Sequence, residues 1–202
     1  MNGKKALLVV DIQNDFCPGG SLAINQGDRI IKPINELISA FGKARLPVLF
    51  TRDWHPVDHC SFKTRGGPWP PHCVRGTYGA RFHSSLRIPP KAIVISKGTK
   101  RNFDAYSGFE GTELAEQLRG LGASELIVCG LATDYCVRNT VLDAIEHGFE
   151  ATIVTDCTRG VNIVRTDSAN SLRRMASKGA NRLSSRDILR MLSRRVAVSS
   201  SS

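Results

Sequence analysis

The sequence places a carboxylate, an amine and a thiol shortly after three separate apolar runs, and together these groups could catalyse a hydrolysis. The residues are Asp11, Lys97 and Cys136. A thiol becomes a strong nucleophile when a nearby base removes its proton, and a carboxylate can act as that base. An ammonium group beside the carboxylate would hold it and tune its pKa. This combination is typical of an enzyme that attacks a carbonyl carbon with cysteine.

The thiol of Cys136 is predicted to lie at the start of a helix, because apolar residues at helical spacing follow over 141–145. Unpaired N–H groups and the helix dipole at such a position favour a thiolate over a thiol. The same N–H groups can stabilise an oxyanion. The alternative is a buried, unreactive cysteine, which is our interpretation of Cys17, Cys129 and Cys157.

We predict that the base is Asp11 and not a histidine. His147 falls at the far end of the helix that Cys136 begins, too far for a Cys–His pair. A carboxylate that is partly buried at a strand end has a raised pKa and can collect the thiol proton. Considered singly, Asp11 could cap a turn and Lys97 could be a surface amine.

Histidines are concentrated in one segment that is rich in proline and glycine, so it is predicted to be a loop. Asp53 and His55 place two ligands on one side of an extended chain, and His72 can fold back onto them. One carboxylate with two or three imidazoles suits a zinc, manganese, iron or cobalt ion and leaves positions open for water or substrate. We expect one divalent metal ion, zinc before manganese or iron. The sequence leaves open whether His59 is a further ligand.

Alternating strands and helices must position these residues. Apolar runs predict strands at 5–10, 47–51, 92–95, 125–129 and 151–155, with a weaker sixth near 180–183. Helical periodicity predicts helices at 28–43, 112–119, 137–147, 165–178 and 185–194. The order favours a three-layer α/β fold with a central, mostly parallel sheet of about six strands and helices on both faces. Ligands bind at the carboxyl ends of such strands, where all the residues above are expected to meet.

The bulk composition predicts a single domain over 1–195 and a disordered tail over 196–202 in the chain of 202 residues. No apolar run is long enough to cross a membrane. The six cysteines follow no secretion signal, so we expect free thiols and a cytoplasmic protein. The net charge of +10 arises largely between 165 and 195, where we expect solvated helix faces and no nucleic-acid site.

Five motifs, in order along residues 5–190, closely resemble those of the nicotinamidases, which are isochorismatase-like cysteine hydrolases. They are Val9-Val10-Asp11-Ile12-Gln13-Asn14-Asp15-Phe16, Asp53-Trp54-His55-Pro56, Trp69-Pro70-Pro71-His72-Cys73, Ser96-Lys97-Gly98 with the segment 104–109, and the segment 130–137. The resemblance implies a Rossmann-like sheet and the Asp11–Lys97–Cys136 triad. It also implies that Asp53, His55 and His72 are the metal ligands.

The same resemblance implies the substrate and its pocket. The backbone N–H groups of Ala132 and Cys136 would form an oxyanion hole, with a cis peptide bond between Leu131 and Ala132. The ring pocket would be lined by aromatic residues, namely Phe16, Trp69, Tyr106 and Tyr135. Tyr135 replaces a histidine that some members have, which leaves the role of its side chain open.

The expected reaction converts nicotinamide to nicotinate and ammonia through a cysteine thioester, with the metal anchoring the pyridine nitrogen and pyrazinamide as a further substrate. N-carbamoyl and ureido amidases and isochorismatase itself are the nearest rivals. As relatives they lack the Asp-x-His metal set, and isochorismatase also lacks the cysteine, whereas this sequence has both. Outside the enzymes, the rival is a basic metal- or RNA-binding module, which ammonia release would exclude. The sequence leaves open whether the chain forms a homo-oligomer.

Overall fold

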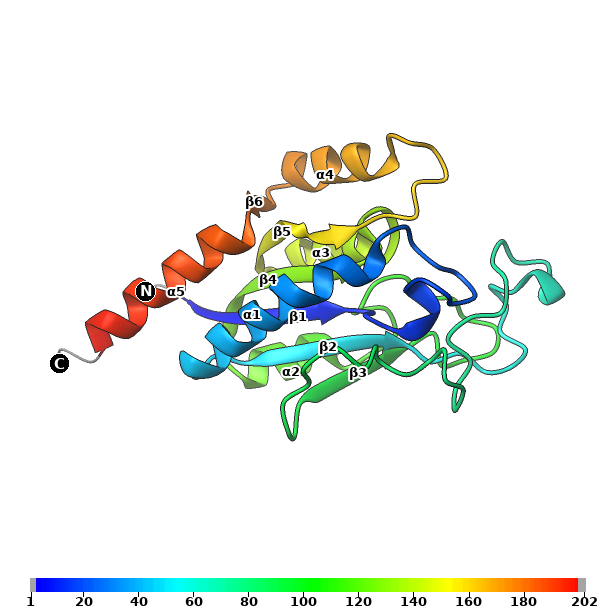
Figure 1. Ribbon diagram of the computed structural model, residues 1–202, viewed down its shortest axis with the longest axis horizontal. Helices are drawn as coiled ribbons and strands as arrows, with labels where there is room; N and C mark the ends of the chain where they lie inside the picture. Colours follow the sequence, from blue (N-terminus) through cyan, green and yellow to red (C-terminus); the bar gives the residue numbers. More distant parts are fainter. Residues whose placement is uncertain (1–2, 200–202) are drawn as a thin grey trace.

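A single parallel sheet forms the centre of the molecule. The computed structural model describes residues 3–199, with side-chain exposure described for 3–194. The strands are β1 (Lys4–Val10), β2 (Val48–Asp53), β3 (Ile93–Lys97), β4 (Ala123–Leu131), β5 (Glu150–Arg159) and β6 (Asn181–Leu183), in the order β3-β2-β1-β4-β5-β6 (Figure 1). All the pairings between them are parallel, so the predicted α/β fold is confirmed and its sheet is parallel throughout the described chain.

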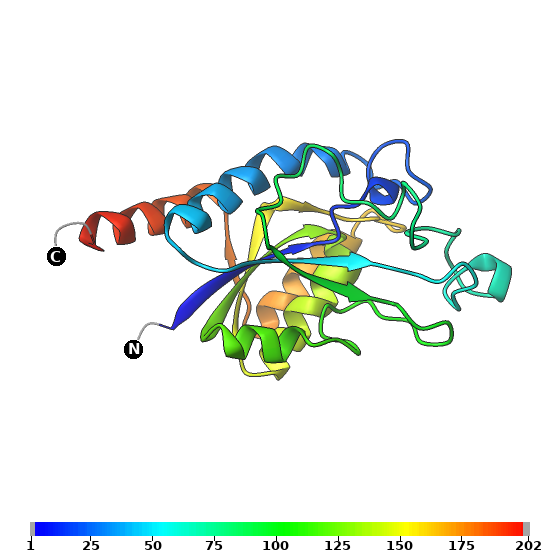
Figure 2. The same cartoon turned by 90° about the horizontal axis from the view of Figure 1, so that it is seen from below.

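Helices cover both faces of this sheet (Figure 2). One face carries α1 (Ile31–Lys43) and α5 (Ser185–Ser199), and the other carries α2 (Leu114–Gly120), α3 (Arg138–Glu146) and α4 (Asp167–Ser177). Each face has its own apolar core, because alternate residues of the buried strand β1 point to opposite sides. The apolar stripe of α1 packs on the first of these cores.

Several element boundaries differ from the sequence prediction by a few residues, and two of these differences bear on the site or on the end of the chain. Helix α5 continues to Ser199, past the predicted end at 194 and into the segment 196–202 that was expected to be a disordered tail. No glycine or proline follows Ala180, so no residue interrupts the helix there. Residues 200–202 lie outside the described residues.

The second difference concerns Asp53 and Lys97, which are the last residues of β2 and β3 and do not lie beyond them. The two residues face each other in the ladder of these strands, so the pairing extends as far as the functional side chains. The ladder therefore fixes the ends of both strands, for example through the bond from the N–H of Trp54 to the carbonyl oxygen of Lys97.

The order in which strands are added to the sheet reverses at β1. The chain places β2 and β3 on one side of β1 and then β4, β5 and β6 on the other. In open parallel sheets, binding sites form beyond the carboxyl ends of the strands at such a point. Asp11 follows β1 directly. Among the helices of residues 3–199, none combines the length and apolar character that a membrane crossing needs.

Candidate active site and metal cluster

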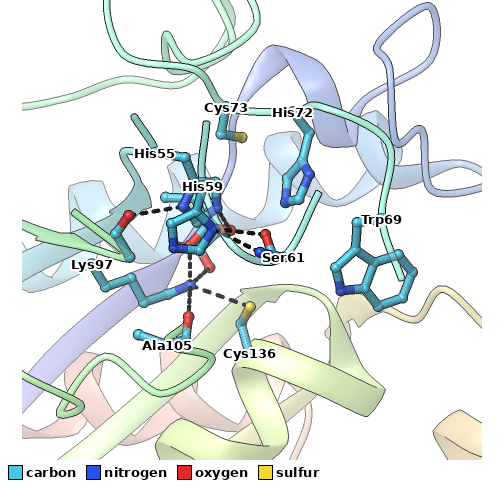
Figure 3. Close-up of polar contacts among 12 residues, drawn as sticks. His55, His59, Ser61, Trp69, His72, Cys73, Lys97, Ala105 and Cys136 are labelled. Atoms are coloured by element: carbon cyan, nitrogen blue, oxygen red, sulfur yellow. Dashed lines mark hydrogen bonds and ion pairs between the residues drawn. The ribbon is translucent and has the colours of Figure 1, made fainter. Parts of the chain in front are cut away.

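The ammonium group of Lys97 lies at the centre of the site and is fully buried. Its Nζ lies 3.0 Å from Asp11 Oδ2, forms an ion pair with Asp53 Oδ1 and lies 3.3 Å from Cys136 Sγ (Figure 3). It also lies 3.5 Å from the carbonyl oxygen of Ala105. The structure thus brings together the three predicted catalytic residues, and the alternative of a surface amine at position 97 is wrong.

Asp11 is held in a strained turn immediately after β1. Its φ of 50° lies in the left-handed region, which residues with a Cβ rarely adopt. Its N–H donates to the carbonyl oxygen of Thr51 at 3.2 Å, and its Oδ1 accepts a hydrogen bond from Thr51 Oγ1 at 2.6 Å. The neighbouring strand therefore fixes both the backbone and the carboxylate of Asp11, which leaves Oδ2 for Lys97.

The two carboxylates share one ammonium group, and their pKa values move in opposite directions. Burial raises the pKa of Asp11, although Lys97 opposes the rise. Burial would also raise the pKa of Asp53, but Lys97 and His55 lower it below its usual range. Burial would lower the pKa of Lys97, but Asp11 and Asp53 raise it well above its usual value. Asp11 is therefore the carboxylate suited to accept a proton, while Lys97 stays charged.

The thiol of Cys136 lies in a π-helical turn, Thr133–Val137, directly before α3, close to the predicted helix start. Burial raises its pKa well above 9.0, although the Lys97 ammonium lowers it in part. Desolvation disfavours the charged sulfur and so opposes the effect predicted for the helix start. A protonated thiol needs a base, and the acceptor atoms of Asp11, Asp53 and Cys136 lie within 4.8 Å of one another.

A cavity beside Cys136 is lined on several sides by aromatic side chains. All four residues predicted for the ring pocket contribute to it: Phe16, Trp69, Tyr106 and Tyr135. Trp69 packs edge-on against Tyr135 at 5.0 Å between ring centroids, and its Nε1 donates to the hydroxyl of Tyr106 at 2.9 Å. Such a wall suits a flat aromatic ligand of about one ring. Ala132 also lines the cavity, and the peptide bond between Leu131 and Ala132 is cis.

The predicted metal ligands converge on the same cavity. Asp53, His55 and His72 are buried, line the cavity and each offer one ligand atom within 4.8 Å of the others. His55 Nδ1 donates to the carbonyl oxygen of Gly98 at 2.9 Å, and His72 Nδ1 donates to that of Pro70 at 2.8 Å. These bonds leave the Nε2 lone pair of each ring free, which is the usual arrangement of metal-binding histidines. The three residues therefore fit a borderline divalent ion such as zinc.

The charge states of the two histidines follow from their surroundings. Burial lowers the pKa of His72, which favours its neutral ring. Burial would also lower the pKa of His55, but Asp53, whose Oδ2 lies 3.7 Å from His55 Nε2, raises it. The Nε2 position of His55 thus attracts a positive charge, which a metal ion can supply in place of a proton.

His59 lies beside this cluster with both ring nitrogens engaged elsewhere. Its Nε2 donates to the carbonyl oxygen of Phe103 at 3.1 Å, and its Nδ1 accepts from Ser61 Oγ at 2.7 Å. Its ring stacks on that of His55 at 4.1 Å between centroids. In this arrangement, His59 supports the His55 ring and offers no free lone pair to the cluster.

Several residues around the site were missed from the sequence. Thr51 holds the Asp11 carboxylate, and Leu22, Ile24 and Val161 line the apolar side of the cavity. No sequence signal could have identified them, because each is an ordinary strand or loop residue whose role depends on the tertiary fold.

Comparison with known proteins gives one family for nearly the whole chain. Residues 5–187 match the model of the isochorismatase domain. The chain is 41% identical over 197 residues to the nicotinamidase of Escherichia coli (strain K12), with 87% of this chain and 92% of that protein covered.

Two solved structures share the fold closely. The pyrazinamidase of Pyrococcus horikoshii, determined in complex with zinc, is 47% identical with a TM-score of 0.86, covering 90% of this chain and 99% of that one. PnC1 from L. infantum, determined in complex with nicotinate, is 35% identical with a TM-score of 0.82, covering 92% of this chain and 94% of that one.

Proposed function

The chain belongs to the isochorismatase family, and from this membership we propose that it is a nicotinamidase that converts nicotinamide to nicotinate and ammonia. One observation carries the proposal: the cavity that Cys136 lines is bounded by aromatic rings and by the Asp53–His55–His72 cluster. These features suit a pyridine carboxamide. The nucleophile can attack the amide carbon, the flat apolar wall can pack on the ring, and an ion in the cluster could bind the ring nitrogen. Pyrazinamide has the same amide and a ring nitrogen in the same relation to it, so we propose it as a second substrate.

The first half of the proposed reaction forms a thioester. Asp11 accepts the proton of the Cys136 thiol, and the sulfur attacks the amide carbon, so that a C–S bond forms. The backbone N–H groups of Ala132 and Cys136 donate to the oxyanion that develops on the amide oxygen. Asp11 returns its proton to the amide nitrogen, the C–N bond breaks and ammonia leaves. The Lys97 ammonium stays charged and holds Asp11 in place.

The second half of the proposed reaction hydrolyses the thioester with water. Asp11 accepts a proton from the water, whose oxygen attacks the thioester carbon. The C–S bond then breaks, the sulfur regains the proton from Asp11, and nicotinic acid leaves and gives up its carboxyl proton to the solvent as nicotinate. Each proton that Asp11 takes is returned, so the residue finishes in the state in which it began.

The metal ion is proposed to orient the substrate. Asp53, His55 and His72 would hold it, and when bound it would supply an open coordination position for the ring nitrogen. Trp69, Tyr106 and Tyr135 would pack against the ring. Zinc is the proposed ion, because the donor set suits it and the pyrazinamidase of P. horikoshii was determined with zinc.

All six cysteines are free, which supports a reducing compartment such as the cytoplasm.

Ammonia release tests the proposed function directly. The protein is assayed with nicotinamide, pyrazinamide and an N-carbamoyl amino acid, each with and without a metal chelator. We expect ammonia from the two ring amides only, and a loss of turnover after chelation that added zinc restores. Ammonia from the N-carbamoyl compound alone would contradict the assignment to nicotinamide.

Replacing His55 with alanine is expected to weaken metal binding severely, because it removes one of the three groups that converge on the cluster. We expect the zinc affinity to fall by more than the 10- to 100-fold typical of losing an outer partner. The measurement is the zinc content by elemental analysis after dialysis. His147→Ala is the matched control, since His147 stacks on Phe109 at the end of α3 and should leave the zinc content unchanged. Full zinc content in the His55 variant would refute its role as a ligand.

A further inference from the structure

The side-chain amide of Gln13 has no part in the reaction proposed above, yet it is fully buried and makes three hydrogen bonds. Its Nε2 donates to the carbonyl oxygens of Asp53 at 2.8 Å and of Ala80 at 2.9 Å. Its Oε1 accepts a hydrogen bond from the N–H of Asp53 at 2.8 Å. One side chain thus satisfies both polar backbone groups of a residue in the metal cluster.

Asp53 needs this partner because β1 ends too early to pair with it. The pairing of β1 with β2 extends to Val10 and Thr51, after which Asp11 turns the chain away. The backbone groups of alternate strand residues point to the same neighbour, so those of Asp53 face the β1 side, as those of Thr51 do. The amide of Gln13 carries a donor and an acceptor, and it replaces the missing strand residue.

These bonds fix the backbone from which the Asp53 carboxylate extends. On the opposite side, the N–H of the next residue, Trp54, donates to the carbonyl oxygen of Lys97 at 3.0 Å. The carboxylate then reaches two groups at once: Oδ1 pairs with Lys97, and Oδ2 lies 3.7 Å from His55 Nε2. A small rotation of the Asp53 backbone would move its carboxylate away from the histidines.

We infer that Gln13 is a positioning residue for the metal cluster and acts through the main chain of Asp53. This inference rests on the metal site proposed above and not on the identity of the amide substrate. A glutamine that only completed the sheet would add to folding stability without changing the affinity of the folded protein for a metal ion. Zinc affinity therefore separates the two roles.

The test compares two variants. Each loses one side-chain amide that forms hydrogen bonds with backbone groups of another segment. Gln13→Met keeps the side-chain size and removes the three hydrogen bonds. The control is Asn35→Leu: Asn35 donates to the carbonyl oxygen of Ser85 at 2.8 Å and accepts from the N–H of Arg87 at 2.9 Å, and neither partner belongs to the cluster. Zinc affinity is measured by competition between the apoprotein and a chromogenic chelator, and stability by thermal unfolding.

We expect Gln13→Met to bind zinc about 10- to 100-fold more weakly, the usual effect of losing a partner of a metal ligand. Asn35→Leu should lower the melting temperature and leave zinc affinity unchanged. Wild-type zinc affinity in Gln13→Met would overturn the inference, and so would an equal loss in both variants.

If Gln13→Met does not fold, Gln13→Asn decides the question by the same measurement. Asparagine keeps the amide on a side chain one methylene shorter, so it cannot reach both groups of Asp53, and the same selective loss of zinc affinity is expected. A wild-type protein that binds no zinc would overturn the metal site and this inference with it. A zinc-bound protein that releases no ammonia from nicotinamide would contradict only the proposed function.

Discussion

Replacing Cys136 with alanine is expected to abolish ammonia release from nicotinamide while the protein stays folded. The variant removes the atom that forms the thioester, and no other cysteine lines the cavity in the described structure. Loss of a nucleophile lowers turnover by several orders of magnitude, so we expect a fall of at least about 10⁴-fold. The thiol is small and buried, so stability should change by only about 1 kcal/mol. A coupled ammonia assay and thermal unfolding measure the two effects.

Cys129→Ala is the matched control for this variant. Cys129 is also buried, but it lies within β4, and its sulfur is 3.8 Å from the carbonyl oxygen of Leu8. This control should lose some stability and keep its turnover. Appreciable ammonia release by the Cys136 variant, or equal inactivation of both, would contradict the assignment of Cys136 as the nucleophile.

Replacing Asp11 with asparagine is expected to stop the formation of the thioester. Asparagine has nearly the same shape and can still accept the hydrogen bond of Thr51, but it cannot take the proton of a thiol whose pKa is raised by burial. General-base catalysis contributes about 10²- to 10⁴-fold, so we expect turnover to fall by that factor or more. Lys97 keeps its ion pair with Asp53, so the protein should remain folded. Rapid mixing measures the first burst of ammonia, which should disappear.

Asp156→Asn serves as the control for the loss of a hydrogen-bonded carboxylate. Asp156 accepts hydrogen bonds from the N–H and hydroxyl of Ser185 at the start of α5, and it does not line the cavity. This variant should be less stable and show a normal burst. A normal burst in the Asp11 variant would exclude Asp11 as the base.

Much of the fold and the three catalytic candidates could be predicted from local sequence patterns, whereas the residues of the ring pocket came from the resemblance to a family. The buried strand β1 is a continuous apolar run, and α1 repeats its apolar residues at helical spacing. Once the strands were known, their parallel arrangement required Asp11, Lys97 and the turn before α3 to meet at one edge. The six strands and five α-helices all lie within a few residues of their predicted positions, apart from the longer α5.

The errors concern quantities that only three-dimensional packing determines. The pKa of Cys136 depends on how completely the fold removes water from its sulfur, which the residues around a helix start do not reveal. The role of Gln13 could not be predicted from its place in a motif, because its hydrogen-bond partners Asp53 and Ala80 are distant in sequence. The hydrogen bonds of His59 depend likewise on a loop at Phe103 that no periodic pattern defines.

The position of Asp53 limits what any substitution at that residue can reveal. One oxygen of its carboxylate neutralises the buried amine, and the other faces the imidazole rings. A change at this position would disturb the proposed acid–base chemistry and the proposed ion binding simultaneously, so an inactive variant could not be attributed to either cause. Genetic screens that recover inactive alleles at this codon therefore cannot distinguish the two roles proposed for the residue.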